Sequence, residues 1–465
     1  MAGDVDLRGL LIQVFLDVAA RIDGQRLVAQ AADRDPAFGA ATRALVVGKV
    51  ALPMWRGWRE SLPPGVAPPP TLLIAPAPLL ADAAWGPRGA PPGLQLAPAD
   101  HPHPSARSVA AAQAALQFVR ASDTGADADT GGGTGRGGGS AGLLVLLSGG
   151  ASSLLCAPAP GLTWEDKREA IAAVARGGAT IRELNVVRKH LSAVKGGGLG
   201  RATRAPIAVR ALSDVIGDDP ATIGSGPFSP DPSTFDQARA LVARLGVTLP
   251  AAVSDHLARG ARGAIPDTAK PGARELEHVD YRVLAGPARV IAEAQAAVTS
   301  AGHPHGELAP DAEDTVEERA QAILACVHRS LPPGNPGTAR PRIWLGNGEP
   351  RVILPPATQV PETSRRGGRA THLALLVARG LAGLPAELRA RVAFLAAGTD
   401  DRDGNTDVSG AAVDGTTWAR ARAAGLDPET ALRSFESLPA LVAAGATVRG
   451  PGTSNLLDLH LLAIG

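Results

Sequence analysis

A glycine- and serine-rich turn follows an apolar run in the first third of the chain. Leu143–Leu147 consists of large aliphatic residues and predicts a buried strand, because strands of an α/β sheet are covered on both faces. The glycines allow close approach of the backbone to a ligand, a serine can cap the helix that follows, and helix-start N–H groups favour an anion. A purely structural strand–helix turn fits the same spacing. The candidate ligand contacts here are Ser148, Gly149, Gly150 and Ser152.

A lysine occupies the corresponding place after an earlier strand. Residues 44–47 predict a short strand, and Gly48 and Lys49 follow it directly. Ligands of open α/β sheets bind at the carboxyl ends of the strands, so Lys49 is a candidate for binding a phosphate or carboxylate group. The segment is not a Walker A loop, since Val50 stands where that loop has Ser or Thr. A solvated lysine without a ligand is the more common interpretation of a Gly-Lys pair alone.

A basic stripe lies beside the apolar stripe of a helix expected over Thr180–Gly198. The apolar residues recur at intervals of three and four, which predicts one buried face; they are Ile181, Leu184, Val187, Leu191 and Val194. A cluster of cations interleaved with Asn and Ser suits phosphate oxygens, although a solvated flank of the helix explains it equally well. The candidate contacts to nucleotide or substrate are Asn185, Arg188, Lys189 and Lys195.

Two acidic segments that follow predicted strands contain the candidate metal ligands. Asp214, Asp218 and Asp219 come after a strand at 206–212, and Asp400, Asp403 and Asp407 come after a strand at 392–397. Mg²⁺ takes one or two carboxylates together with water or phosphate oxygens. Asp214 is the first candidate for binding the metal or for accepting a hydroxyl proton, with Asp400 and Asp407 next. The alternative for the first segment is a structural turn rich in Asp, and the second lacks the terminal Glu of a calcium-binding EF-hand.

The C-terminal half repeats the arrangement of a strand followed by a polar turn. Residues 342–345 lead into a Gly-Asn-Gly turn ending at Glu349, and Gly367-Gly-Arg369 opens a helix expected over His372–Leu381. A guanidinium at a helix N-terminus combines a bidentate fork with free backbone N–H groups, which suits an anion. The candidate site residues of this half are therefore Glu349, Arg369 and Asn455, the last in a terminal Gly-Thr-Ser-Asn motif.

Composition excludes several classes of protein. The 465 residues carry a net charge of +1, which gives no indication of a nucleic-acid surface. Cys156 and Cys326 are the only cysteines, too few for a disulfide framework. The N-terminus reads as an amphipathic helix rather than a signal peptide, and no apolar run reaches the roughly 18 residues of a membrane span. We therefore expect a soluble, cytoplasmic protein that binds neither nucleic acid nor membrane.

Strands and helices alternate along the chain, which predicts an α/β fold with two α/β domains. We expect these domains over residues 1–275, with a Rossmann-like N-terminal domain, and 276–465, with the option that the strand at 456–464 returns to the first domain. Residues 123–141 are rich in Gly, Thr and Asp and predict a disordered surface insert. The formal G-x-G-x-x-G match within it precedes a strand instead of following one, so it is no dinucleotide fingerprint.

These motifs together, in this order, resemble one family, the type II glycerate 2-kinases with a C-terminal MOFRL domain. The resemblance spans about residues 5–460, and the stretches at 185–235 and 398–415 are the most specific. The matching stretches are GK at 48–49, HPHP at 101–104, LLSGGASSLL at 146–155, NVVRKHLSAVKGG at 185–197, LSDVIGDDPATIGSGPFSPDPSTF at 212–235, GNGE at 346–349, GGR at 367–369, GTDDRDGNTDVSGAAVDG at 398–415 and GTSNLLDL at 452–459.

The resemblance implies ATP-dependent phosphorylation of D-glycerate to 2-phosphoglycerate, with Mg²⁺, in a cleft between two α/β domains. It implies that Lys49 and Arg369 are catalytic, and we place Asp214 beside them. Three places depart from the family pattern. His372 stands after Arg369 where the family resembles Glu, Ser105 replaces an expected Asp, and Leu457 replaces a polar residue.

Two other functions remain open at this stage. One is a hydroxypyruvate reductase or related hydroxyacid dehydrogenase, for which the chain has no correctly placed dinucleotide fingerprint. The other is a glycerate-binding relative that has lost catalysis, which the missing carboxylate at His372 suggests. The expected partners are glycerate and ATP, and a homodimer is a possible assembly.

Overall fold

The computed structural model describes residues 6–83, 85, 89–123, 142–310, 314–331, 340–354, 366–400, 402–452 and 454–465. These residues form two compact units, residues 24–284 and residues 1–23 together with 285–465. The expected insert lies outside the described residues except for Asp123. Asp123 itself belongs to the fold, because its Oδ1 accepts hydrogen bonds from Thr203 Oγ1 at 2.5 Å and from the backbone N of Arg204 at 2.8 Å.

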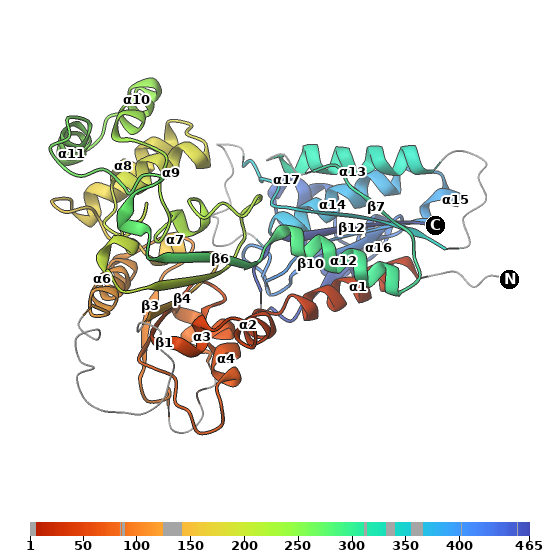
Figure 1. Cartoon of the computed structure of the whole chain (residues 1–465). Coiled ribbons are helices and arrows are strands. Elements are labelled where there is room, and N and C mark those ends of the chain that lie inside the picture. Colours follow the sequence, from red (N-terminus) through yellow and green to blue (C-terminus); the bar gives the residue numbers. More distant parts are fainter. Residues whose placement is uncertain are drawn as a thin grey trace. The chain divides into compact units, whose positions relative to one another are not determined.

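A six-stranded sheet in the order β3-β2-β1-β4-β5-β6 is the centre of residues 24–284 (Figure 1). Its strands are β1 (Ala41–Val47), β2 (Thr71–Pro76), β3 (Leu94–Ala99), β4 (Gly142–Leu147), β5 (Ile207–Leu212) and β6 (Val279–Ala285). The first five pair in parallel with their neighbours. The apolar run Leu143–Leu147 is almost fully buried in the sheet interior, as its composition predicts. The strand order is that of doubly wound dinucleotide-binding folds.

Helices cover both the sheet and a separate core in this unit. They are α2 (Gly24–Ala32), α3 (Ala37–Ala40), α4 (Ala51–Ser61), α5 (Ala77–Ala81), α6 (Ala106–Arg120), α7 (Ala151–Leu154), α8 (Trp164–Arg176), α9 (Ile181–His190), α10 (Phe235–Leu245) and α11 (Ala251–Ala261). The apolar face of α6 packs in one cluster with residues of β1 and β4, and α4 contacts β1, β2 and β4. Helices α8 to α11 share a second apolar core.

Helix α9 is shorter than its apolar pattern predicts. It ends at His190 instead of Gly198, and Ile181 at its start is 56% exposed rather than buried. Leu191 and Val194 are buried, but they lie in the turns that follow the helix. Gly196 and Gly197 have φ angles of +55° and +82°, which only glycine adopts readily, so the chain cannot continue as a helix there.

The second unit contains a mixed sheet in the order β11-β10-β9-β12-β8-β7. Its strands are β7 (His305–Glu307), β8 (Arg342–Gly348), β9 (Val392–Gly398), β10 (Gly410–Asp414), β11 (Thr447–Val448) and β12 (Asp458–Ile464). Strand β12 is antiparallel to both β8 and β9. The last strand is therefore central to this sheet, and the option that it returns to the first domain is wrong.

The helices of this unit are α1 (Leu7–Arg21), α12 (Pro287–Ser300), α13 (Val316–Ser330), α14 (Arg369–Ala382), α15 (Ala386–Arg389), α16 (Thr417–Ala423), α17 (Pro428–Ser434) and α18 (Ser437–Ala443). Helices α13 and α14 lie on one face of the sheet, and α1 and α12 lie on the other (Figure 1). The first helix thus belongs to the unit formed by the C-terminal half, whereas the expected boundary placed it in the N-terminal domain. Its apolar face indicates burial but not the partner that buries it.

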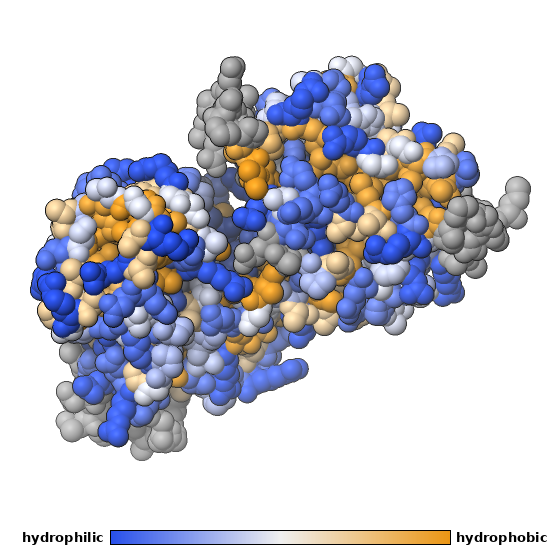
Figure 2. All heavy atoms as spheres, turned by 90° about the horizontal axis from the view of Figure 1, so that it is seen from above, coloured by the Kyte–Doolittle hydropathy of each residue, from blue (hydrophilic) through white to orange (hydrophobic). Residues whose placement is uncertain are grey.

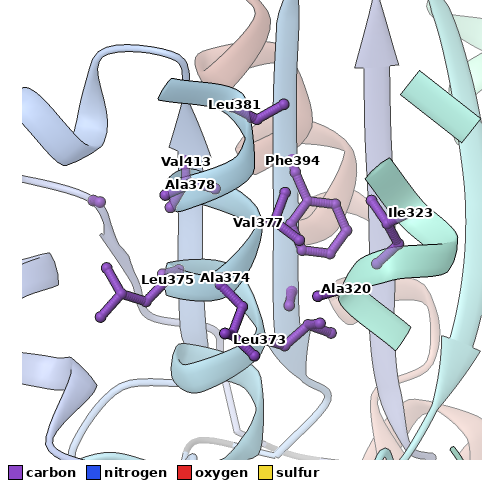
Figure 3. Close-up of a cluster of buried hydrophobic side chains, with 14 of the residues drawn as sticks. Ala320, Ile323, Leu373, Ala374, Leu375, Val377, Ala378, Leu381, Phe394 and Val413 are labelled. Atoms are coloured by element: carbon purple, nitrogen blue, oxygen red, sulfur yellow. The ribbon is translucent and has the colours of Figure 1, made fainter. Parts of the chain in front are cut away.

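The core of the second unit fixes the position of α14, the helix that begins with Arg369. Leu373, Ala374, Val377, Ala378 and Leu381 of α14 point toward Phe394 of β9, Val413 of β10, and Ala320 and Ile323 of α13 (Figure 3). Because the helix is buried along its length, its first turn has a fixed place relative to the carboxyl end of β9. The side chains of that turn are therefore held rigidly.

On the face drawn in Figure 2, apolar residues occur as separate patches among hydrophilic ones. No helix within the described ranges is long and apolar enough to cross a membrane. Cys156 and Cys326 are both buried and free.

Candidate active site

Lys49 and the glycine–serine turn meet at the point where the strand order of the first sheet reverses. Strands β1 and β4 are direct neighbours, with β2 and β3 on one side and β5 and β6 on the other. The backbone N of Lys49 donates to the carbonyl oxygen of Gly149 at 2.9 Å. A Cβ on Gly150 would lie only 2.9 Å from Lys49 Cγ, so glycine permits this contact. The structure thus brings together these two predicted elements where doubly wound sheets bind ligands.

Ser148 has a different role from the one predicted for it. Its hydroxyl accepts a hydrogen bond from the backbone N of Val50 at 3.1 Å, and the side chain is fully buried. Helix α7 has only four residues, and its N-cap is Gly150, with φ +83° and no side-chain cap. A side chain at Gly48, with φ +136°, would collide with Ser148. Ser148 therefore holds the two turns together and is neither a helix cap nor exposed to a ligand.

His101, the first residue of the HPHP stretch at 101–104, also lies in this group. Its Cδ2 lies 3.1 Å from the place of a Cβ on Gly150, beside the Lys49 side chain. Burial, the charge of Lys49 and the nearby His103 lower the pKa of His101 to about 4. The ring is therefore neutral at physiological pH and can donate or accept one hydrogen bond next to Lys49.

The basic stripe of α9 divides into residues with different surroundings. Lys189 Nζ forms a buried ion pair with Asp231 Oδ1 at 3.1 Å, and Asp231 also accepts from Ser233 and Thr268. This prediction is corrected, because Lys189 is part of an internal network instead of pointing to a ligand. Lys195, beyond the helix, donates from Nζ to the carbonyl oxygen of Ser152 at 2.6 Å and to its hydroxyl at 2.9 Å.

Arg188 and Asn185 lie next to each other on α9. Arg188 Nη1 is 3.4 Å from Asn185 Oδ1, a long hydrogen bond between partly buried side chains. Burial lowers the pKa of Arg188. Arg188 also acts electrostatically on Lys195, whose Nζ donates to Ser152.

Asp214 follows β5, at the carboxyl edge of the sheet, as predicted. Burial, Asp219 and Asp214 all raise the pKa of Tyr281, whose hydroxyl has no hydrogen-bond partner within the described residues. Asp219 accepts hydrogen bonds from Ala221 N at 3.1 Å and Thr222 Oγ1 at 2.6 Å, the structural turn considered as the alternative. The described residues contain no group of three acidic, His or Cys side chains that could hold a metal.

Arg369 of the second unit is held by two carboxylates. Its Nε and Nη2 atoms donate to Oδ2 and Oδ1 of Asp458 at 2.7 and 3.0 Å, and Nη2 also donates to Glu349 Oε1 at 2.6 Å. Burial alone lowers the pKa of Arg369, but Asp458 and Glu349 outweigh it and raise the pKa well above its usual value. The guanidinium is permanently charged and oriented. Sequence reasoning missed Asp458, although it lies within the quoted GTSNLLDL stretch.

The start of α14 already has an internal anion. Asp403 accepts hydrogen bonds from the backbone N atoms of Ala370 at 3.0 Å and Thr371 at 2.7 Å. Burial and the neighbouring Asp458 raise the pKa of Asp403 to about 6. The expectation that these N–H groups are available to a ligand is corrected, because Asp403 occupies them. The helix also begins three residues earlier than predicted, at Arg369 itself.

The structure does not gather the other predicted site residues of this unit, Asp400, Asp407 and Asn455, into one group. Asp400 and Asp458 lie on the same side of Gly398, within 2.7 and 3.3 Å of the place of a Cβ there. Asp407 is 72% exposed and pairs with Arg449, so the structure does not bring it together with Asp400. Asn455 is buried, in a segment tied to Thr399 by the bond from Leu456 N at 2.7 Å.

His372 is in the core of the second unit. It is 4% exposed and stacks on Phe435 with a centroid distance of 5.1 Å. Burial and Arg379 lower its pKa to about 4. The departure from the family pattern at this position therefore lies in an apolar contact instead of at a ligand.

Comparison with known proteins relates both units to one group. Residues 11–258 match the family described as a domain of unknown function, DUF4147, and residues 342–458 match the MOFRL family. A D-glycerate 2-kinase of Thermotoga maritima is 32% identical over 319 residues, covering 68% of this chain and 71% of the relative. A protein of Agrobacterium vitis with the provisional name hydroxypyruvate reductase is 34% identical over 374 residues, covering 80% and 88%.

The fold has a solved counterpart over its whole length. The crystal structure of a glycerate kinase from Thermotoga maritima has a TM-score of 0.76 and 27% identity, covering 99% of each chain. The likeness includes both units, so the mixed α/β architecture described above is shared by the two proteins.

Proposed function

Since this chain belongs to the family of glycerate kinases with a C-terminal MOFRL domain, we propose that it transfers a phosphoryl group from ATP to D-glycerate. The product would be 2-phosphoglycerate, with ADP as the second product. In this reaction the oxygen of the 2-hydroxyl group forms a bond to the γ-phosphorus, and the bond between that phosphorus and the ADP oxygen breaks. The hydroxyl proton passes to a protein base.

The observation that carries the proposal is the contact of Lys49 with Gly149 and Gly150. A cation beside a glycine-rich backbone turn, at the strand-order reversal of a parallel sheet, is suited to a phosphate group. Phosphoryl transfer needs positioning and charge neutralisation more than covalent participation. We assign to Lys49 the neutralisation of charge on the transferred group, and to Arg369 the binding of an oxyanion of the substrate.

The metal and the base are assigned to carboxylates at strand ends. Mg²⁺ would be held by Asp214 or Asp400 together with ATP phosphates, and would supply a Lewis acid that neutralises phosphate charge. The absence of a three-carboxylate cluster among the described residues fits a metal that takes most of its oxygens from the nucleotide. Asp214, at the end of β5, is our candidate for accepting the hydroxyl proton.

A hydroxypyruvate reductase is the second candidate. The name of the Agrobacterium relative and the strand order of the first sheet both favour it. However, the turn after β1 contains Gly48 followed by Lys49 and Val50, without the further glycines that bring a backbone close to a dinucleotide pyrophosphate. The kinase is therefore the better supported function.

A coupled assay distinguishes these functions. Release of ADP is measured with ATP, Mg²⁺ and D-glycerate, and phosphorus NMR identifies which hydroxyl carries the phosphate. Oxidation of NADH by hydroxypyruvate is measured in parallel. ADP release with a 2-phosphate product supports the proposal. NADH oxidation without ADP release identifies a reductase, and glycerate binding without either reaction identifies a relative that has lost catalysis.

A further inference from the structure

Two buried lysines bind the segment that follows the glycine–serine turn. Lys195 Nζ donates to the carbonyl oxygen and hydroxyl of Ser152, as described above, and only 2% of the residue is exposed. Lys167 of α8 is equally buried, and its Nζ donates to the carbonyl oxygen of Ala157 at 3.2 Å. Both ammonium groups thus converge on the short stretch between Ser152 and Ala157, from different elements of the first unit.

The guanidinium of Arg188 lies near both lysines. Arg188 acts electrostatically on both Lys167 and Lys195, and Lys167 acts on Lys195, so the three charges are near neighbours. Their mutual repulsion adds to the cost of burial. Burial is the largest cause of the lowered pKa of each of the three groups, and it holds the pKa of Lys167 at about 8.

We call Lys167, Arg188 and Lys195 the cation cluster. It has no carboxylate partner among the described residues. The neighbouring Lys189 has one, Asp231, in the ion pair described above. The cations that act electrostatically on the cation cluster are its own members and Lys189. Burying cations without a counter-ion is costly, and a bound anion would supply the opposite charge.

Hydroxyl groups complete the surroundings of the cation cluster. The Ser152 and Ser225 hydroxyls are 2.8 Å apart, and Ser152 is partly exposed whereas Ser225 is buried. Ser225 has φ +64°, a conformation that costs energy for a residue other than glycine. Backbone strain of this kind persists where the surroundings require it, and here it places a hydroxyl on Ser152 beside Lys195.

We propose that the cation cluster, with the hydroxyls of Ser152 and Ser225, binds a phosphoryl group. The oxygens of a phosphoryl group accept charge-assisted hydrogen bonds from ammonium and guanidinium groups, which neutral ligands cannot match. The inference rests on the proposed function, because both the nucleotide and the phosphorylated product contain such a group. Lys167 belongs to none of the sequence motifs considered above, so it is a ligand residue that only the structure identifies.

The variant that tests this inference is Lys167→Met. Methionine retains the apolar stem of lysine, and Ala157 O keeps hydrogen bonds from Ser192 Oγ and Ala193 N at 3.2 Å each. We expect the ligand-free variant to unfold at a higher temperature than the wild type, because repulsion in the cation cluster is relieved. We expect it to bind orthophosphate at least about tenfold more weakly, because a charged hydrogen-bond donor is lost.

Calorimetric titration and thermal unfolding at constant ionic strength measure these two effects. Arg239→Met, which removes an exposed cation from α10 of the same unit, is the control for the change in net charge. Titrations with ADP, adenosine, 2-phosphoglycerate and glycerate identify the source of the phosphoryl group. If Lys167→Met loses affinity only for ADP, the cation cluster binds the nucleotide. If it loses affinity only for 2-phosphoglycerate, the cation cluster binds the product.

Wild-type affinity of Lys167→Met for orthophosphate, ADP and 2-phosphoglycerate would overturn the proposal. If Lys167→Met does not fold, the same titrations and unfolding measurements are made on Arg188→Gln. If neither variant folds, these cations stabilise the protein, and that result would contradict the expected repulsion and overturn the proposal. The result is independent of turnover. A protein without kinase activity can still bind orthophosphate through the cation cluster, and an active kinase can lack this site.

Discussion

Arg369 and Asp458 form a bidentate pair between the first residue of α14 and the first residue of β12, with N···O distances of 2.7 and 3.0 Å. The pair joins a helix start to the central strand of the second sheet. Because two donor atoms of the guanidinium are fixed by one carboxylate, its remaining surface is presented in one orientation. This is the feature of the second unit on which a catalytic role for Arg369 depends.

Arg369→Lys is expected to reduce kcat/KM for glycerate nearly as much as Arg369→Ala, on the order of 100-fold. Lysine keeps the positive charge but cannot form the paired hydrogen bonds to Asp458, so the cation loses its fixed position. Steady-state kinetics of both variants measure the effect, with Arg379→Lys on the outer part of the same helix as control. Full activity of Arg369→Lys would show that charge alone is required at this position.

Asp403→Asn is expected to change how stability depends on pH. The pKa of Asp403 is raised to about 6 in the folded protein, above the value of 3.8 for an unperturbed Asp. Its contribution to the free energy of unfolding is therefore present below about pH 4 and is lost as the pH rises through 6. Denaturant unfolding of both proteins between pH 4 and 7 measures this. The wild type should lose stability relative to Asp403→Asn across the window, and parallel curves would contradict the raised pKa.

His372→Glu is expected to destabilise the protein instead of improving metal binding. The residue is buried against Phe435, and a carboxylate there would have no partner, at a cost of about 3–5 kcal/mol. His372→Phe keeps the stacked ring and is the matched control.

His372 should also make the stability of the protein depend on pH. Its pKa is about 4 when folded, below the unfolded value of about 6.5, so its contribution to stability is lost as the pH falls from 6.5 to 4. His372→Phe should lose less stability than the wild type in that range. A stable His372→Glu protein with a tighter Mg²⁺ dependence would instead place this residue at the ligand.

The sequence predicts four strands of the first sheet, β1, β2, β4 and β5, because they are local, apolar and followed by recognisable turns. The expected boundary at 275 is wrong for β6, which it placed in the second domain although β6 is an edge strand of the first sheet. The sequence also predicts that Lys49 and Gly150 lie at the same sheet edge, since carboxyl ends of parallel strands share one edge. It does not reveal β3, which contains Gln95 and Pro98 and is only partly buried at an edge. Nor does it assign α1 to its unit, because an amphipathic pattern carries no information about which sheet buries it.

The site residues that sequence reasoning missed or misplaced depend on contacts between distant positions. Asp458 is 89 residues from Arg369, and Asp403 is 33 residues from the backbone N of Ala370 that it binds. Spacing within one helix likewise could not distinguish Lys189, which pairs with Asp231 42 residues away, from Arg188 next to it. Local pattern predicts which residues share a face, whereas the counter-ion of each charge is decided by tertiary packing.

The central claim is that Lys49 neutralises charge on the phosphoryl group during transfer to glycerate. The most direct measurement is the rate of ADP release by Lys49→Ala at saturating ATP and glycerate, together with its melting temperature and those of the wild type and the surface control Arg239→Ala. The account predicts a fall in kcat on the order of 100-fold or more for Lys49→Ala at an unchanged melting temperature, and no change for Arg239→Ala. Near wild-type turnover of a folded Lys49→Ala protein would contradict it.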